Sequence, residues 1–199
     1  MQLRNIRCPQ DIRNLSVEEL ESLSEEIRSE IVRVVSTNGG HLASSLGAVE
    51  ITLALHKVFD TPRDKVVWDV GHQSYAHKLI TGRYDTFGSL RKLGGISGFP
   101  KRAESPYDVY DTGHAAGSIS YALGLAKARD LDGGNWNVID VIGDGALTSG
   151  VAYEGLNNAG ELRTRLVVVL NDNSMSISKN VGGITRYLTL LRLAPSYRG

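Results

Sequence analysis

The chain of 199 residues contains a single cysteine, and this scarcity bears on where the protein works. Cys8 has no partner for an internal disulfide, which favours a reducing compartment. No apolar run approaches the roughly 20 residues that a membrane-spanning helix needs, and the N-terminal segment lacks the apolar core of a secretory signal. We therefore expect a soluble, cytoplasmic protein with no membrane partner.

An excess of charge of either sign is also absent, because 22 Lys and Arg residues balance 22 Asp and Glu residues. Nucleic-acid-binding domains normally show a clustered excess of basic residues, so we expect no nucleic-acid partner. Hydrophobic residues make up 41% of the chain and charged residues 22%, as in ordinary globular proteins. This length favours one domain that spans residues 1–199.

Glycine, in contrast, is plentiful, with 22 residues in the chain. Many of these glycines fall at segment ends, as in Gly39-Gly40, Gly94-Gly95 and Gly182-Gly183. Such a distribution indicates tight turns or close approaches of the backbone to a ligand.

Capping signals and apolar spacing predict an alternation of helices and strands. Ser16 and Glu19 form a capping box that opens a helix ending at Asn38-Gly39-Gly40. A second helix is expected from Ser44 or Ser45 to Phe59, after an irregular lead-in over residues 1–15. The other expected elements are strands over 65–70, 136–142 and 166–170, helices over 74–81, 116–129, 148 or 149 to 160, and 183–193, and a long loop over 82–113.

The expected strands are apolar throughout rather than alternating. Strands of this kind, separated by helices, are typical of a parallel sheet with helices on both faces. The sequence therefore predicts an α/β fold, and we find neither an internal repeat nor a linker between domains.

Polar clusters follow two of the expected strands, namely Gly143-Asp144-Gly145 and Asn171-Asp172-Asn173. Ligands of open parallel sheets bind beyond the carboxyl ends of the strands. Twenty-five residues lie between Gly145 and Asn171, which is room for a helix and a returning strand. A right-handed crossover would bring the two clusters side by side.

The chemistry of these clusters suits a metal-bridged diphosphate. Asp144 and Asn173 offer hard oxygen ligands for Mg²⁺, which usually takes few protein side chains together with substrate phosphates. Gly143 and Gly145 leave backbone amides uncovered, and a helix starting near Thr148 offers an anion site. The alternative is that both clusters are polar turns without a ligand.

The spacing of the two clusters resembles the thiamine diphosphate motif, and residues 12–198 as a whole resemble the N-terminal domain of the 1-deoxy-D-xylulose-5-phosphate synthase family, within the transketolase-like superfamily. Two of the motifs, Trp68–Gln73 and Gly94–Arg102, separate this family from ordinary transketolases. The matching stretches are residues 39–44, 68–73, 94–102, 113–114, 141–146 and 170–178.

The resemblance implies a thiamine diphosphate-binding fold with Mg²⁺ and thiamine diphosphate as cofactors. Asp144, Asn173 and the backbone carbonyl of Met175 would ligate Mg²⁺. The residues implied to contact the cofactor are His72, Gly113, His114, Ala115, Gly145, Ala146 and Asn173, and those implied to handle protons are His41, His72 and His114. The implied reaction joins pyruvate to glyceraldehyde 3-phosphate with loss of CO₂, in isoprenoid and thiamine biosynthesis. Lone histidines are more often structural, as we expect for His56 and His77.

The sequence departs from the family in two places. Ala115-Ala116 stands where the family has a hydroxyl-rich turn, which would weaken cofactor binding. The chain also stops at Gly199, so we expect it to lack the second and third domains that the resemblance implies, and with them the glutamate that activates the cofactor. We expect that it is inactive alone and pairs with itself or with a chain that carries the missing domains. The alternatives are a non-catalytic cofactor-binding or partner-binding module and one subunit of a split transketolase-like enzyme.

Overall fold

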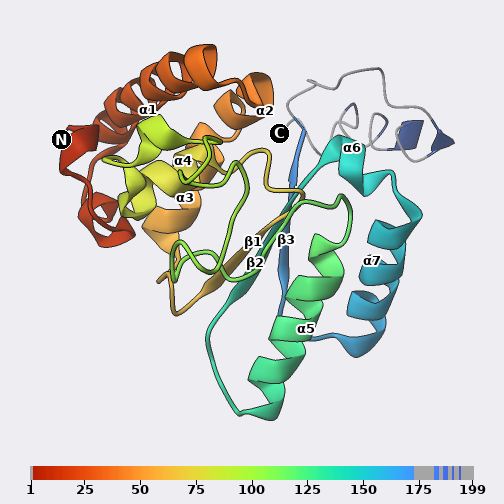
Figure 1. Ribbon diagram of the computed structural model, residues 1–199. Helices are drawn as coiled ribbons and strands as arrows, with labels where there is room; N and C mark the ends of the chain where they lie inside the picture. Colours follow the sequence, from red (N-terminus) through yellow and green to blue (C-terminus); the bar gives the residue numbers. More distant parts are fainter. Residues whose placement is uncertain (1, 173–181, 184–185, 188–189, 191–192, 194–199) are drawn as a thin grey trace.

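A parallel sheet of three strands lies at the centre of the protein (Figure 1). The computed structural model describes residues 2–172 and the single positions 182, 183, 186, 187, 190 and 193. The strands are β1 (Lys65–Trp68), β2 (Val138–Gly143) and β3 (Val167–Asn171), and β2 lies between the other two. All the pairs are parallel, which confirms the predicted class of fold.

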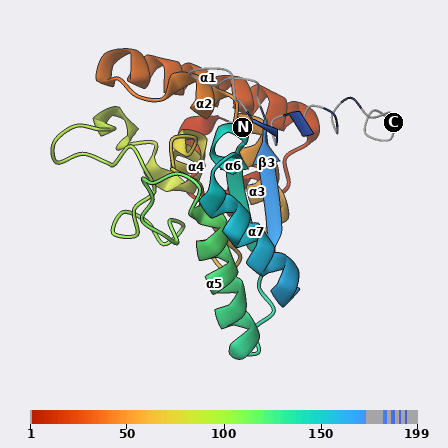
Figure 2. The same ribbon diagram turned by 90° about the vertical axis from the view of Figure 1, so that its right-hand side faces the viewer.

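Helices cover both faces of this sheet, as the apolar strands predict. The helices α5 (Ser118–Leu131) and α7 (Gly150–Leu162) lie on one face, where Ile119 packs with Ile142 of β2. The helix α3 (Val49–Val58) lies on the other face, where Leu55 packs with Trp68 and Ile139. Figures 1 and 2 show the sheet between these two layers.

The long helix α1 (Val17–Asn38) anchors a second, mainly helical core beside the sheet (Figure 1). Leu23, Ile27 and Ile31 recur every four residues along one face and are fully buried. The predicted capping box is confirmed. The Ser16 hydroxyl accepts a hydrogen bond from the Glu19 amide, and the Glu19 carboxylate accepts one from the Ser16 amide.

The lead-in is more regular than the sequence predicts. It forms two 3₁₀ turns, Leu3–Asn5 and Pro9–Ile12, and buries Leu3, Ile6 and Ile12 in the α1 core. Local patterning missed these turns because each is stabilised by distant apolar contacts rather than by its own few hydrogen bonds.

The prediction of one helix from Ser44 or Ser45 to Phe59 is wrong. The structure has two helices there, α2 (Leu42–Leu46) and α3, separated at Gly47 and Ala48. The Ser44 and Ser45 hydroxyls do not cap a helix, because both donate to the backbone carbonyl of His72. They connect α2 to the segment that follows β1.

Other boundaries also differ from the prediction. The strand β1 ends at Trp68, because Val70 and Gly71 turn with positive φ. The helix α4 (Tyr75–Lys78) continues into a wide turn over Leu79–Arg83, and a short helix α6 (Asp144–Leu147) precedes α7. The expected helix over 183–193 falls mostly outside the described residues. Within the part of the chain that the structure describes, no helix has the length and apolar composition needed to cross a bilayer.

A buried carboxyl group lies in the middle of the central strand. Asp140 of β2 is fully buried, and none of the described residues forms a hydrogen bond with either of its oxygens. Burial raises the pKa of Asp140 to about 7, and the charge of Asp69 adds to the rise. The folded protein therefore holds this proton more tightly than the unfolded chain does, in which the pKa is about 4.

We predict that Asp140→Asn stabilises the protein in a pH-dependent way. Because the folded pKa is raised, wild-type stability falls as the pH rises from about 4 to about 7 and then levels off. Relative to wild type, the free energy of unfolding of the variant should gain roughly 2–3 kcal/mol between pH 5 and pH 8. Urea denaturation at both pH values measures this gain. An equal difference at both values would contradict the prediction, and the exposed control Asp132→Asn should show none.

Candidate functional site

The carboxyl ends of β2 and β3 meet at one edge of the sheet. In the register of this pair, Gly143 lies opposite Asn171. The two polar clusters that follow these strands therefore start side by side, as the crossover argument predicts.

The first cluster is the start of a helix rather than an open turn. Gly143 caps α6, whose first residues are Asp144, Gly145 and Ala146. Gly145 is exposed at the end of the sheet, and Asp144 and Ala146 are half-buried. The tight strand-to-helix turn places Asp144 directly after β2.

The second cluster is described only in part. Asn171 and Asp172 are described, whereas Asn173 and Met175 lie outside the described residues. The pairing of Asp144 with Asn173 and the Met175 carbonyl around Mg²⁺ therefore stays a prediction. Among the described residues, no group of three or more His, Cys, Asp and Glu side chains forms a metal centre. The predicted Mg²⁺ site would not form such a group, because Asp144 is its one acidic residue and the other two ligands are an amide and a backbone carbonyl.

A buried hydrogen bond connects β3 to the segment after β1. The Asn171 side-chain amide donates to the side-chain carbonyl of Gln73 at 3.0 Å, and both side chains are buried. The Gln73 amide nitrogen and the neighbouring His72 Nδ1 are buried without a partner among the described residues. Buried polar atoms are normally paired, so these two are free to bind a ligand or water at this edge. Sequence reasoning missed Gln73, although an amide beside a histidine after a buried strand was the available signal.

The structure brings His41 and His72 together. Their ring centroids are 5.8 Å apart and the rings are nearly perpendicular. His41 occupies the residue before α2, where its backbone amide reaches the Tyr75 hydroxyl at 3.4 Å. Gly71 precedes His72 with a φ of +91°, and a Cβ there would lie 2.4 Å from both Pro100 and Thr112. Glycine is thus required where the backbone turns His72 towards His41.

Both imidazoles are predominantly neutral near pH 7. Burial lowers the pKa of His72; the charge of His41 lowers it further, and that of Asp69 opposes the shift. Burial, followed by the charge of Arg91, lowers the pKa of His41. A neutral imidazole has a free ring nitrogen that can accept a proton, so this pair can act in proton transfer.

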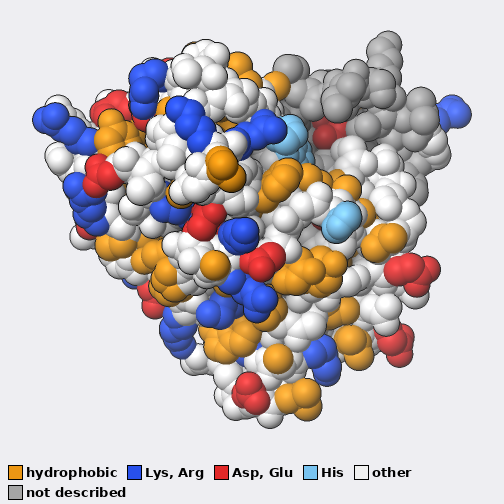
Figure 3. All heavy atoms as spheres, viewed as in Figure 1, with side chains coloured by type: hydrophobic (Ala, Val, Ile, Leu, Met, Phe, Trp, Pro, Cys, Tyr) orange, Lys and Arg blue, Asp and Glu red, His pale blue; other side chains and the backbone are white. Residues whose placement is uncertain are grey.

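His114 lies in a different part of the same region. With Gly113 it lines a cavity of about 290 Å³ between the end of β1 and the start of α5. Val70, two residues before His72, lines the same cavity, and Ala115 is exposed beside it. Figure 3 shows histidine side chains that reach the surface on this face.

Asp69, which the sequence argument did not single out, fixes this segment. Its buried carboxylate accepts hydrogen bonds from the amides of Ala116 and Ser118, at 3.0 and 3.3 Å. These bonds join the end of β1 to the first turn of α5 and so position Gly113 and His114. The signal was an aspartate directly after an apolar strand.

The remaining histidines and the basic pair of the long loop have partners outside the predicted cofactor and metal residues. His56 and His77 are fully buried and bonded to each other, as expected for structural histidines. Lys101 and Arg102 are exposed, and the Arg102 amide donates to the Asp111 carboxylate at 2.6 Å.

Comparison with known proteins gives a consistent result. The family model described as 1-deoxy-D-xylulose-5-phosphate synthase matches residues 3–199. The chain is 64% identical over 187 residues to 1-deoxy-D-xylulose-5-phosphate synthase 2 of Geobacter sulfurreducens, covering 94% of this chain and 30% of that protein.

Two further synthases show the same pattern. The chain is 58% identical over 195 residues to the enzyme of Desulfitobacterium hafniense and 59% identical over 193 residues to that of Thermus thermophilus. These matches cover 98% and 97% of this chain and 31% of each relative. The chain thus spans about a third of the length of the curated relatives it matches, and it belongs to the 1-deoxy-D-xylulose-5-phosphate synthase family as the counterpart of the N-terminal part of those proteins.

Proposed function

We propose that this chain is the diphosphate- and Mg²⁺-binding part of a thiamine diphosphate-dependent transferase. The reaction converts pyruvate and glyceraldehyde 3-phosphate into 1-deoxyxylulose 5-phosphate and CO₂, and it supplies precursors for isoprenoids and thiamine in the cytoplasm. The observation that supports this most is the register of β2 and β3, because it starts both predicted ligand clusters at one edge of the sheet.

The residues at this edge fit the cofactor chemically. A carboxylate beyond β2 and an amide beyond β3 match the oxygen ligands that Mg²⁺ prefers. Exposed Gly145 leaves backbone uncovered where the diphosphate is expected. The unpaired His72 Nδ1 and Gln73 amide nitrogen face no described partner and offer hydrogen bonds to a bound group.

In the proposed mechanism the side chains bind and orient, and the histidines carry protons. Asp144, Asn173 and the Met175 carbonyl would hold Mg²⁺, and Gly145 and Ala146 would lie against the diphosphate. The chemistry that thiamine diphosphate supplies when bound is an electron sink for decarboxylation and for carbon–carbon bond formation. Each neutral imidazole of the His41–His72 pair can accept a proton at a ring nitrogen and return it.

The rest of the proposed site comes partly from the segment before α5 and partly from other domains. His114, Gly113 and Ala115 would contact the cofactor from the far side of the His72 turn. The activating glutamate has no counterpart among the residues assigned here. We therefore propose that activity requires the domains that the longer relatives possess, on the same chain or on a partner chain, and that the assembled protein is a homodimer.

A non-catalytic cofactor-binding or partner-binding module is the second candidate. The observation that favours it is the Ala115-Ala116-Gly117 segment, which has no hydroxyl where the family has a hydroxyl-rich turn. The two functions differ in turnover but share the cofactor site, so binding is tested first.

We predict that thiamine diphosphate binds this chain only with Mg²⁺, and that Asp144→Ala removes the Mg²⁺-dependent binding. Loss of a residue that merely supports a metal ligand typically weakens metal binding about 10–100-fold, so loss of the ligand itself should cost at least as much. Calorimetric titration of the cofactor, with and without Mg²⁺, measures the effect. Glu161→Ala, an exposed carboxylate change on α7, is the control and should bind like wild type. Equal affinity of the Asp144 variant and wild type would refute the assignment.

Restoring a hydroxyl at position 115 should strengthen cofactor binding. Ala115 is exposed, so Ser is accommodated there, and one added neutral hydrogen bond contributes about 0.5–1.5 kcal/mol. We expect Ala115→Ser to lower the dissociation constant roughly 2- to 10-fold in the same titration. Ala103→Ser, at an exposed alanine of the long loop, should change nothing. Unchanged affinity of the Ala115 variant would show that this segment does not contact the cofactor.

A further inference from the structure

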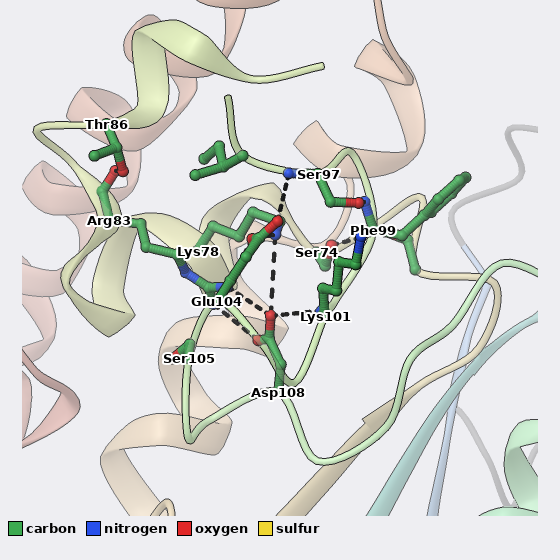
Figure 4. A network of polar contacts seen from close by, with 12 residues as sticks. Ser74, Lys78, Arg83, Thr86, Ser97, Phe99, Lys101, Glu104, Ser105 and Asp108 are labelled. Atoms are coloured by element: carbon green, nitrogen blue, oxygen red, sulfur yellow. Dashed lines mark hydrogen bonds and ion pairs between the residues drawn. The ribbon is translucent and has the colours of Figure 1, made fainter. Parts of the chain in front are cut away.

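A cluster of buried charges connects the long loop to the helix α4, outside the residues assigned to cofactor and metal (Figure 4). This buried charge cluster consists of Lys78, Arg83, Glu104 and Asp108. Lys78 binds Glu104 at 2.7 Å, and Arg83 binds the two Asp108 oxygens at 2.6 and 2.9 Å. The side chains of Lys78 and Asp108 are completely buried, and those of Arg83 and Glu104 are nearly so.

The surroundings of Asp108 hold its carboxyl group in the charged form. Burial raises the pKa of Asp108, but hydrogen bonds from His77 and Arg83 outweigh this effect, so that the net pKa is well below its usual range. Burial and the charge of Arg83 lower the pKa of Lys78, whereas Glu104 and Asp108 oppose that shift. Two cations facing two carboxylates leave the cluster without net charge.

Net stability is a weak explanation for such a cluster. Removing paired charges from water costs about as much as their attraction returns, and apolar replacements are often as stable. Buried ion pairs instead fix the geometry of their surroundings, because each carboxylate has several acceptor positions and each of these needs a donor in the right place.

The remaining acceptor positions bind the backbone of the loop. Glu104 accepts a hydrogen bond from the Ser97 amide at 2.5 Å, and Asp108 accepts one from the Lys101 amide at 2.8 Å. The Ser97 hydroxyl in turn accepts a hydrogen bond from the Phe99 amide at 3.1 Å. The segment 97–101, which we call the 97–101 turn, has no regular secondary structure, so these bonds fix its shape (Figure 4).

The 97–101 turn packs directly against the histidine pair. The Phe99 ring lies 6.0 Å from the His41 ring, measured between centroids. Phe99 and Pro100 also lie so close to Gly71, the residue before His72, that a Cβ at Gly71 would reach within 3.2 and 2.4 Å of them. The 97–101 turn therefore packs along one side of the His41–His72 pair.

We infer that Glu104 and Asp108 are positioning residues of the candidate site, which hold Phe99 against His41 through the 97–101 turn. Whether the packing of Phe99 against His41 matters for a reaction rests on the proposed function, whereas the positioning itself is a property of the chain alone. No substrate or metal contact is assigned to either carboxylate.

The packing of the 97–101 turn against His41 affects the pKa of its imidazole, which can be measured. Burial lowers the pKa of this imidazole, and the charge of Arg91 adds to the effect. Arg91 belongs to the same assembly, because its amide donates to the Ile96 carbonyl at 2.8 Å and its side chain lies against Gly98. Among the described residues, the other titratable groups that face His41 are the His72 ring and the Tyr75 hydroxyl. His41 is already an exposed residue whose ring is only partly covered, so loosening the turn removes the remaining cover and moves Arg91 away, and both changes raise the pKa.

The test is the pKa of His41 in Glu104→Gln, measured without cofactor in the 199-residue chain. Glutamine keeps the shape of glutamate, but its amide group must face either the Ser97 amide or the two cations, so one set of bonds is lost. We expect the His41 pKa, followed by NMR of the ring and assigned with His41→Gln, to rise towards about 6.5. Glu30→Gln, which breaks the ion pair with the exposed Arg33 on α1, is the matched control and should leave the His41 pKa unchanged.

A second pair of variants separates positioning from general loosening. Phe99→Leu removes the ring without touching the buried charge cluster and should raise the His41 pKa in the same direction. The double variant with Glu104→Gln should show no more than the larger single shift, because both act through one contact. Additive shifts, or an unchanged pKa in Glu104→Gln, would overturn the inference.

Two further outcomes are informative. If Glu104→Gln fails to fold, Ser97→Ala takes its place, since it removes only the hydroxyl that binds the Phe99 amide; an unchanged His41 pKa in that variant overturns the inference. Because these titrations need no cofactor, failure of thiamine diphosphate to bind would refute the proposed function and leave the positioning result standing.

Discussion

The parallel pairing of β2 with β3 determines what this domain can present to a ligand. The ladder ends with Gly143 opposite Asn171, so the chain leaves both strands at one level of the sheet. A shift of one residue would turn alternate side chains to the opposite face and move the Asp144 turn away from the turn after β3. The apolar strand interiors enforce the register, because Ile139 and Val141 pack on the α3 side and Ile142 on the α5 side.

Around this edge, buried polar side chains hold loops that have no regular structure of their own. The Asp69 carboxylate accepts a hydrogen bond from the Ala116 amide at the start of α5. The Gln73 side-chain carbonyl accepts one from the Asn171 side chain. Glu104 and Asp108 accept hydrogen bonds from amides of the 97–101 turn. Asp69 and Gln73 are buried and bind segments 47 and 98 residues away, whereas Glu104 and Asp108 bind amides seven residues away and pair with Lys78 and Arg83. A site made from loops is thereby held nearly as firmly as one made from strands and helices, which suits the orientation of a cofactor.

The sequence predicted the features that depend on local periodicity. The capping box at Ser16, the apolar strands and the class of fold are confirmed. Family motifs pointed to His41 and His72, which the structure brings together. The break at Gly47 and the short helix that begins at Asp144 were missed, because each depends on contacts with other segments. The order within the 82–113 loop was invisible for the same reason, since its anchors, Lys78 and Arg83, precede most of the loop.

The most direct test of the account is to locate the divalent cation. A crystal structure of the chain with thiamine diphosphate and Mn²⁺, in which anomalous scattering identifies the metal, would do so. The account predicts one ion beyond the ends of β2 and β3, ligated by the Asp144 carboxylate, the Asn173 amide oxygen and the cofactor's diphosphate. An ion bound elsewhere, or Asp144 and Asn173 directed to opposite sides of the sheet, would contradict it.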